Sequence, residues 1–321
     1  MQRKQGRGPS GLQSRLKPVE LDPLAEYGLP SKGEKRLLVH KIQESYYALI
    51  ASRYLAFCTA AGDRDNLQKQ FAGLSLSNNL SSSSSASQQL SVDQLPSLPS
   101  LTATAQTALA GASASSAEEK QRDTLPQLLF ALRKLREGLV SADRRDHFAA
   151  QVFLFSVRLG VLTGAYETYL PAGLHLLRCG GGGGNTDSPT PAASLTSVEH
   201  HEVVSYLVLD AACRRSDLSA APLRGDDKHV DAALAALVSD DWVAWRRVRR
   251  QVDGYRARLM GFAEARMVGH TLKAFARAYL TVPLAVLEEQ TGCEWEELRG
   301  TYGVGWEREG EKVVIRRVQG R

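Results

Sequence analysis

The chain has 321 residues, of which 43% are apolar, and its 40 lysines and arginines outnumber its 35 aspartates and glutamates, for a formal net charge of +5. No stretch approaches the roughly 20 consecutive apolar residues of a membrane-spanning helix, and no apolar segment follows the basic N-terminus as in a secretory signal. Four widely spaced cysteines without a Cys-x-x-Cys pair predict neither a zinc knuckle nor a dense disulfide framework. We therefore expect a protein of the cytoplasm or the nucleus that does not bind membranes.

The N-terminal part predicts a pair of helices behind a polar arm. Residues 1–30 are basic and interrupted by four prolines, which is typical of a disordered segment. Residues 31–34, Ser-Lys-Gly-Glu, have the spacing of a capping box, in which Ser and Glu side chains satisfy the first helical amides. Apolar residues three or four apart continue to Ala61, and a second short helix is expected over 65–73. Residues 31–74 are thus expected to form an N-terminal helix pair.

A low-complexity segment follows over residues 75–122. It is dominated by Ser, Ala and Thr, so few apolar side chains are available for burial. Ordering a backbone costs roughly 1–2 kcal/mol per residue, and here little would offset that cost. We therefore expect a linker, with order resuming just before Leu125.

Residues 123–270 predict a series of helices. A leucine stripe at three- and four-residue spacing over 125–139 has charged residues on its other side. A strongly apolar run over 148–169 predicts one central buried helix, and Pro171 is expected to open the next. A flexible insertion is expected over 179–196, because its glycine run lacks the Gly-Lys-Ser/Thr ending of a phosphate-binding loop. Short helix pairs in series suggest a right-handed stack of antiparallel helices, similar to a helical-repeat solenoid. Further helices are expected over 198–214, 217–223, 231–239, 241–260 and 262–279.

Residues 271–321 differ in kind, because a hairpin follows the helices. Thr281 is expected to cap, and Pro283 to begin, a helix that Gly292 ends. After a second short helix, a β-branched strand from Lys312 is expected to pair with the residues before a tight turn. Helices followed by such a hairpin outline a winged helix. The expected fold is all-α: stacked antiparallel helices capped by a small C-terminal winged helix.

The pattern of this C-terminal part carries a family resemblance. It comprises residues 274–282, then Leu284, Leu287, Gly292, Trp295, Leu298, the Gly305-Trp306 pair and Val313-Val314-Ile315. Over residues 123–321 the chain resembles the PCI-type domain. The more similar branch is shared by the smallest signalosome subunit, a proteasome-lid subunit and subunit k of the third translation initiation factor, in a fungal-type form with Ser- and Gly-rich insertions. The resemblance implies a scaffold subunit of a large complex, whose winged helix associates side by side with those of other subunits.

Signatures of catalysis are not found in the sequence. His200 and His201 are adjacent, and neither has a second His four residues away, so the His-Glu-x-x-His zinc pattern is missing. No Gly-x-Ser-x-Gly elbow occurs, and we find no cysteine beside a histidine that would mark an activated thiolate. We therefore expect no enzyme activity, cofactor, metal or small-molecule substrate.

An arginine run over 246–250 leaves two interpretations open. These side chains form either a solvated helix face whose stems cover apolar neighbours, or a phosphate-binding stripe that acts with the basic end of the hairpin. Glutamates on the last short helix argue against reading of duplex DNA. The stripe would make the protein an adaptor for RNA or single-stranded nucleic acid. The residues concerned are Arg246, Arg247, Arg249, Arg250, Arg316 and Arg317.

The strand residues Val313, Val314 and Ile315 also have two interpretations. They either complete the protein's own core or form a free strand edge that pairs with a strand of another subunit. The second interpretation gives our first hypothesis for the function: a non-catalytic scaffold or adaptor that docks into a larger protein assembly through this edge and the helical stack.

Overall fold

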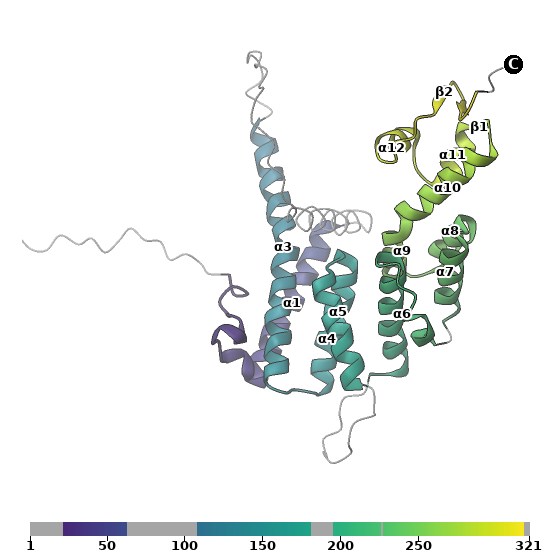
Figure 1. Cartoon of the computed structure of the whole chain (residues 1–321). Helices are drawn as coiled ribbons and strands as arrows, with labels where there is room; N and C mark the ends of the chain where they lie inside the picture. The colour runs from purple at the N-terminus through teal and green to yellow at the C-terminus, as the bar shows by residue number, and fades with distance from the viewer. Residues whose placement is uncertain (1–21, 63–107, 181–194, 226, 318–321) are drawn as a thin grey trace, which may run out of the picture. The chain divides into compact units, whose positions relative to one another are not determined.

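The described part of the chain is mostly helical, with a three-stranded antiparallel sheet near its C-terminal end (Figure 1). It divides into two compact units. Residues up to 60 and residues 111–144 form the first, and the described residues from Arg145 onward belong to the second. The residues that this computed structural model describes are 22–62, 108–180, 195–225 and 227–317.

The first unit contains two long helices and two short 3-10 turns. Its side chains are buried on one face of each long helix, among them Tyr46 on the first and Leu132 on the second. Gly138 lies so close to the turn before the first helix that an added Cβ would be 2.7 Å from the carbonyl oxygen of Leu37. Only glycine fits this approach. The elements are η1 (Pro30–Lys32), η2 (Arg36–Leu38), α1 (His40–Ala61) and α3 (Ala108–Ser141).

The start of this unit differs from the prediction. Packed structure begins before residue 30, because Leu24 is buried and its carbonyl oxygen accepts hydrogen bonds from Tyr46 Oη and Lys134 Nζ, each at 3.0 Å. The predicted capping box is wrong, since Ser31 lies inside η1 and the Glu34 side chain accepts bonds from Arg36. Residues 1–21 of the predicted arm and the predicted helix over 65–73 lie outside the described residues.

The second helix of this unit also begins earlier than expected. α3 starts at Ala108, so residues 108–122 are helical and the prediction of a linker reaching residue 122 is wrong there. This stretch contains five alanines and two adjacent glutamates, and both residue types are good helix formers. α3 also belongs to the same unit as α1, whereas the sequence assigned it to the helical stack. The rest of the predicted linker lies outside the described residues.

The second unit begins with a series of helices, several of which are shorter than predicted. The single helix expected over 148–169 is two helices, because Gly164 at φ 68° ends the first in a left-handed cap. Pro171 then lies inside the next helix. The helix expected over 241–260 is also divided, since the Asp253 side chain accepts bonds from two amides and caps a new helix. The elements are α4 (His147–Thr163), α5 (Tyr166–Gly180), α6 (Ser197–Arg214), η3 (Ala221–Arg224), α7 (Lys228–Ser239), α8 (Trp242–Gln251) and α9 (Gly254–Met260).

Two more predictions for this region, a helix and an insertion, differ from the structure. The helix expected over 217–223 is reduced to the 3-10 turn η3. The insertion expected over 179–196 begins inside α5, which runs to Gly180, and its residues 181–194 lie outside the described ones. The helix predicted over 198–214 is confirmed as α6.

A buried polar cluster joins α5 to α6. Asp210 is fully buried, accepts a hydrogen bond from Tyr169 Oη and lies 3.2 Å from Arg214 Nε. The guanidinium of Arg214 also stacks over the ring of Phe262 at 4.1 Å. A buried carboxylate that keeps both a hydrogen bond and an ion pair is compatible with a packed interior.

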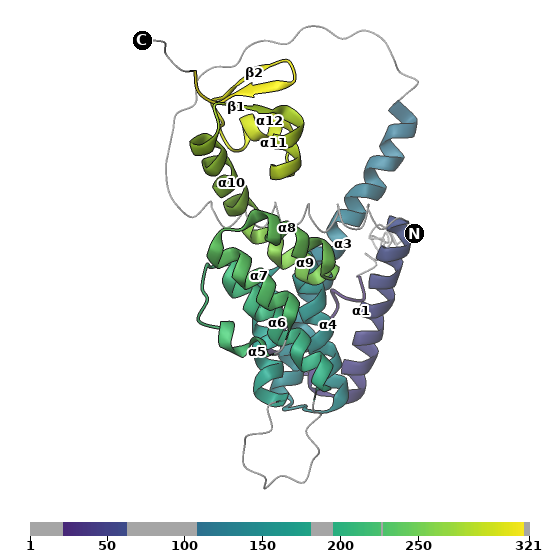
Figure 2. The same ribbon diagram turned by 90° about the vertical axis from the view of Figure 1, so that its right-hand side faces the viewer.

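The chain ends in a small mixed unit, residues 264–317, which we call the C-terminal module. Its sheet has the order β1-β3-β2, with Val282 and Arg308 both opposite Val313. Thr281–Pro283 is therefore strand β1, and the prediction that Thr281 caps a helix is wrong. Figures 1 and 2 show the three helices of the module gathered beside the sheet. After the turn η4 (Gly261–Ala263), the elements are α10 (Glu264–Ala278), β1 (Thr281–Pro283), α11 (Leu284–Thr291), α12 (Trp295–Gly300), β2 (Glu307–Glu309) and β3 (Lys312–Val314).

Candidate docking interface

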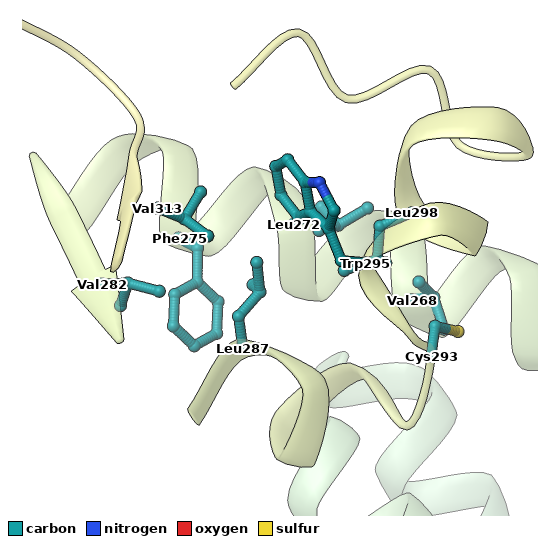
Figure 3. Close-up of a cluster of buried hydrophobic side chains, with 9 residues drawn as sticks. All are labelled: Val268, Leu272, Phe275, Val282, Leu287, Cys293, Trp295, Leu298 and Val313. Atoms are coloured by element: carbon teal, nitrogen blue, oxygen red, sulfur yellow. The ribbon is translucent and has the colours of Figure 1, made fainter. Parts of the chain in front are cut away.

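The C-terminal module has a hydrophobic core of its own. Leu287, Leu298 and Val313 are fully buried, and Phe275 and Trp295 pack with them (Figure 3). These side chains come from α11, α12, β3 and α10, so each element of the module except β2 contributes to the cluster, β1 through Val282. Because the core holds the strands in place, it determines which of their backbone N–H and C=O groups remain free to bind a partner.

The strand predicted to be a free edge is the central strand of the sheet. β3 pairs with β1 on one side and with β2 on the other. Val313 is fully buried, and Val314 and Ile315 are half-buried, with Ile315 packed against the core. The prediction that these three residues present an outer edge is therefore wrong. The sequence did not reveal β1, whose three residues are too few to show the alternation of a strand.

The backbone pairing identifies the groups that do face outward. Leu284 N donates to Glu311 O, and Ile315 N donates to Leu280 O. Hydrogen-bonded pairs alternate along an antiparallel ladder, so the backbone N–H and C=O groups of Val282 and Val313 point toward each other. The backbone groups of Thr281 and Pro283 then point away from β3. By the same alternation, Arg308 of β2 directs its N–H and C=O away from β3.

The two edge strands of the sheet, β1 and β2, differ in how readily they can pair with a further strand. On β1, the outward position Pro283 has no N–H to donate, which limits continued pairing. On β2, the outward position Arg308 keeps its N–H, and charged side chains flank it. Charged residues on an edge strand discourage nonspecific aggregation without removing the backbone groups. β2 is therefore the more suitable edge for a specific strand partner.

The two arginines at the end of the hairpin contact other groups of the protein at its surface. Arg317 Nη2 contacts Glu307 at 2.7 Å and Glu309 at 2.8 Å, which neutralises its charge on β2. Arg316 Nη2 donates to the carbonyl oxygen of Arg277 at 3.1 Å. Residues 280–317 contain eight glutamates and five lysines or arginines, so this part of the module is acidic.

Two of the arginines of the run over 246–250 bind the C-terminal module. Arg246 donates to the carbonyl oxygen of Glu289 in the last turn of α11, where a cation is favoured by the helix dipole. Its guanidinium lies so close to Gly292 that an added Cβ would be 2.9 Å from Nη2. Arg249 pairs with Glu264 in the first turn of α10.

Trp242 of the same helix adds a hydrogen bond to this contact, and Trp245 lines the same small cavity as Met267 and Gln290. Trp242 Nε1 donates to Gln290 Oε1 at 3.3 Å, and Trp245 is 2% exposed. We call Trp242, Trp245, Arg246 and Arg249 the α8 clasp. Its partners are 15 to 48 residues away in sequence, so local spacing gave no signal for it.

The remaining two arginines of the run behave differently. Arg247 and Arg250 are exposed and make no hydrogen bond or ion pair to any residue in the described ranges. Of the six arginines proposed for nucleic-acid binding, four thus contact other groups of the protein, and two of these, Arg316 and Arg317, do so from exposed positions. Their exposure agrees with a solvated helix face for Arg247 and Arg250 and also leaves both guanidinium groups available to a phosphate.

One prediction about reactive groups is wrong. His175 lies four residues before Cys179 on α5, and its Nε2 is 3.6 Å from Cys179 Sγ, so this cysteine does have a histidine neighbour. Within the described ranges, no three His, Cys, Asp or Glu side chains are grouped so that they could hold a metal ion.

No helix among the described residues is both long and apolar enough to cross a bilayer. Comparison of the sequence with protein-family models and with curated proteins gives no match.

Proposed function

We propose that the protein is a non-catalytic scaffold subunit whose C-terminal module is a winged helix that docks onto another protein. The supporting observation is the order α10-β1-α11-α12-β2-β3 with the sheet order β1-β3-β2. A helix, a first strand, two helices and a hairpin that returns beside that strand is the topology of a winged helix. This order also agrees with the resemblance of residues 123–321 to PCI-type subunits.

The α8 clasp supports a docking role. It attaches α11 and α10 of the module to the preceding helices through a capping arginine, an ion pair and a tryptophan hydrogen bond. A module held in a defined orientation loses less conformational freedom when it binds, which favours specific assembly. We therefore propose that the helical stack orients the module for its partner.

We place the partner strand on β2 and not on β3. The outward N–H and C=O of Arg308 can extend the sheet by one strand, whereas Pro283 interrupts the opposite edge. Side-by-side association of winged helices, as the PCI resemblance implies, would use this edge.

The test is the variant Arg308→Pro, with Arg308→Ala as its matched control. Proline removes the outward N–H without removing a bond to β3, and proline is tolerated at such edge positions. Arg308→Ala keeps the N–H and removes only the side chain. The tagged chain is expressed in its native cells, and its sedimentation is followed in a density gradient.

We expect the wild type and Arg308→Ala to sediment with a large assembly and Arg308→Pro to move to the light fractions while its circular dichroism stays helical. If folded Arg308→Pro sediments with the wild type, or if the wild type itself sediments as a free chain, the proposed docking is wrong.

Binding of RNA or single-stranded nucleic acid is the less favoured function. It would rest mainly on Arg247 and Arg250, because the other proposed arginines already contact carboxylates or carbonyl oxygens of the protein. An affinity for homopolymeric RNA that falls steeply with salt, and that the double change Arg247→Ala and Arg250→Ala removes, would favour it over the scaffold role.

A further inference from the structure

The C-terminal part of α5 carries a histidine and a cysteine on one face. His175 and Cys179 are four residues apart, the spacing that brings helical side chains together. Both are half-buried, so neither is closed off from solvent. Neither contributes to the C-terminal module or to the α8 clasp.

The distance between the two donor atoms fits a metal ion. Cys179 Sγ and His175 Nε2 are 3.6 Å apart. A tetrahedral zinc ion with a Zn–S bond of about 2.3 Å and a Zn–N bond of about 2.0–2.1 Å holds such donors about 3.6 Å apart. The distance is therefore compatible with both atoms binding one ion in place of the hydrogen bond between them.

The surroundings hold the histidine in place. The imidazole of His175 stacks on the ring of Phe153 of α4, with the centroids 4.2 Å apart and the planes 25° apart, which holds the orientation of the ring. Phe153 is itself buried, so it forms a fixed support. Cys179 is in the last turn of α5, where the helix dipole places partial negative charge.

We propose that His175 and Cys179 form a chelating site for a divalent transition metal of borderline softness, zinc above all, with water in the remaining positions. Thiolate and imidazole together select such metals over magnesium or calcium. On binding, the Cys179 thiol loses its proton to solvent, a metal–sulfur bond and a metal–nitrogen bond form, and two metal-bound waters leave.

Cobalt(II) provides the probe, because a thiolate bound to cobalt gives a charge-transfer absorption that a hydrogen-bonded thiol does not. Metal-free, reduced full-length protein is titrated with cobalt, and we expect this absorption to saturate at one metal per chain. Cys179→Ser should abolish it. Cys58→Ser is the matched control, because Cys58 is also half-buried on a helix but has no histidine four residues away, and the absorption should be unchanged.

Two histidine variants complete the test. Loss of a second-shell partner already weakens metal binding about 10–100-fold, so His175→Ala should weaken cobalt binding by at least about tenfold. Cys179→His should keep cobalt binding but lose the charge-transfer absorption. Absence of the absorption in the wild type, its persistence in Cys179→Ser, or an unchanged affinity in folded His175→Ala would overturn the proposal. If His175→Ala does not fold, the Cys179→Ser result decides.

Discussion

At the scale of single residues, one arginine organises the segment before α1. The Arg36 side chain donates to a carboxylate oxygen and to the backbone oxygen of Glu26, and to both carboxylate oxygens of Glu34. Its guanidinium also lies over the ring of Tyr27, 4.6 Å from the centroid. Hydrogen bonds from the Arg36 side chain lower the pKa of Glu34 to about 2. A hydrogen bond from Arg53 likewise lowers the pKa of Asp22.

These lowered pKa values predict that the segment over 22–39 loosens in acid. A carboxyl group whose pKa is lower in the folded state stabilises that state above its unfolded pKa and loses this contribution as the pH falls through the folded value. For Glu34 the loss should occur between about pH 4.5 and about pH 2. The measurement is amide hydrogen exchange, corrected for intrinsic rates, in residues 22–39 and in α3 as the reference.

The matched variant is Glu34→Gln, which cannot titrate. It should show weaker protection of the segment already at neutral pH and a smaller further loss in acid. An equal acid response in Glu34→Gln and in the wild type would contradict this role of Glu34.

At the scale of elements, two neighbouring arginines of α8 are expected to contribute differently to stability, because only one of them belongs to the α8 clasp. Arg246 caps the C-terminal end of α11, whereas Arg247 beside it is exposed. We expect Arg246→Ala to lower the free energy of unfolding by about 1 kcal/mol, because a charged donor to a backbone carbonyl is lost. Arg247→Ala should change the free energy by less than about 0.5 kcal/mol.

Urea denaturation of the two variants tests this inequality. Equal stability of Arg246→Ala and Arg247→Ala would mean that the clasp does not stabilise the folded chain. The comparison is well matched, because the two substitutions remove the same side chain from adjacent positions of one helix.

The presence of most helices could be predicted from the sequence, but their ends could not. Apolar periodicity correctly located α6 and α7, where a buried face continues through the whole helix. It missed the breaks at Gly164 and Asp253, because the apolar pattern continues across both while the backbone does not. It also missed β1, because Thr281 followed by Pro283 resembles the start of a helix.

At the scale of the whole chain, the sheet topology determines where a partner strand can bind. Because β1 belongs to the sheet, β3 is the central strand and β2 is an edge strand. A strand of only three residues thus changes where the proposed interface lies. The docking surface could not be predicted from local patterns, because it depends on pairing between segments about 30 residues apart. The contacts of Arg246 and Arg316 could not be predicted for the same reason, because their partners are 43 and 39 residues away in sequence.

Hydrogen exchange of the Arg308 amide, measured in the free chain and in the sedimented assembly, tests whether a partner strand binds to β2. In the free chain we expect rapid exchange at Arg308, whose N–H faces outward from β2, and slow exchange at Val313, whose N–H is bonded to β1. In the assembly, Arg308 should become protected while Val313 stays protected. Equal exchange of Arg308 in both states would rule out docking through β2, and an unprotected Val313 in the free chain would rule out the central position of β3.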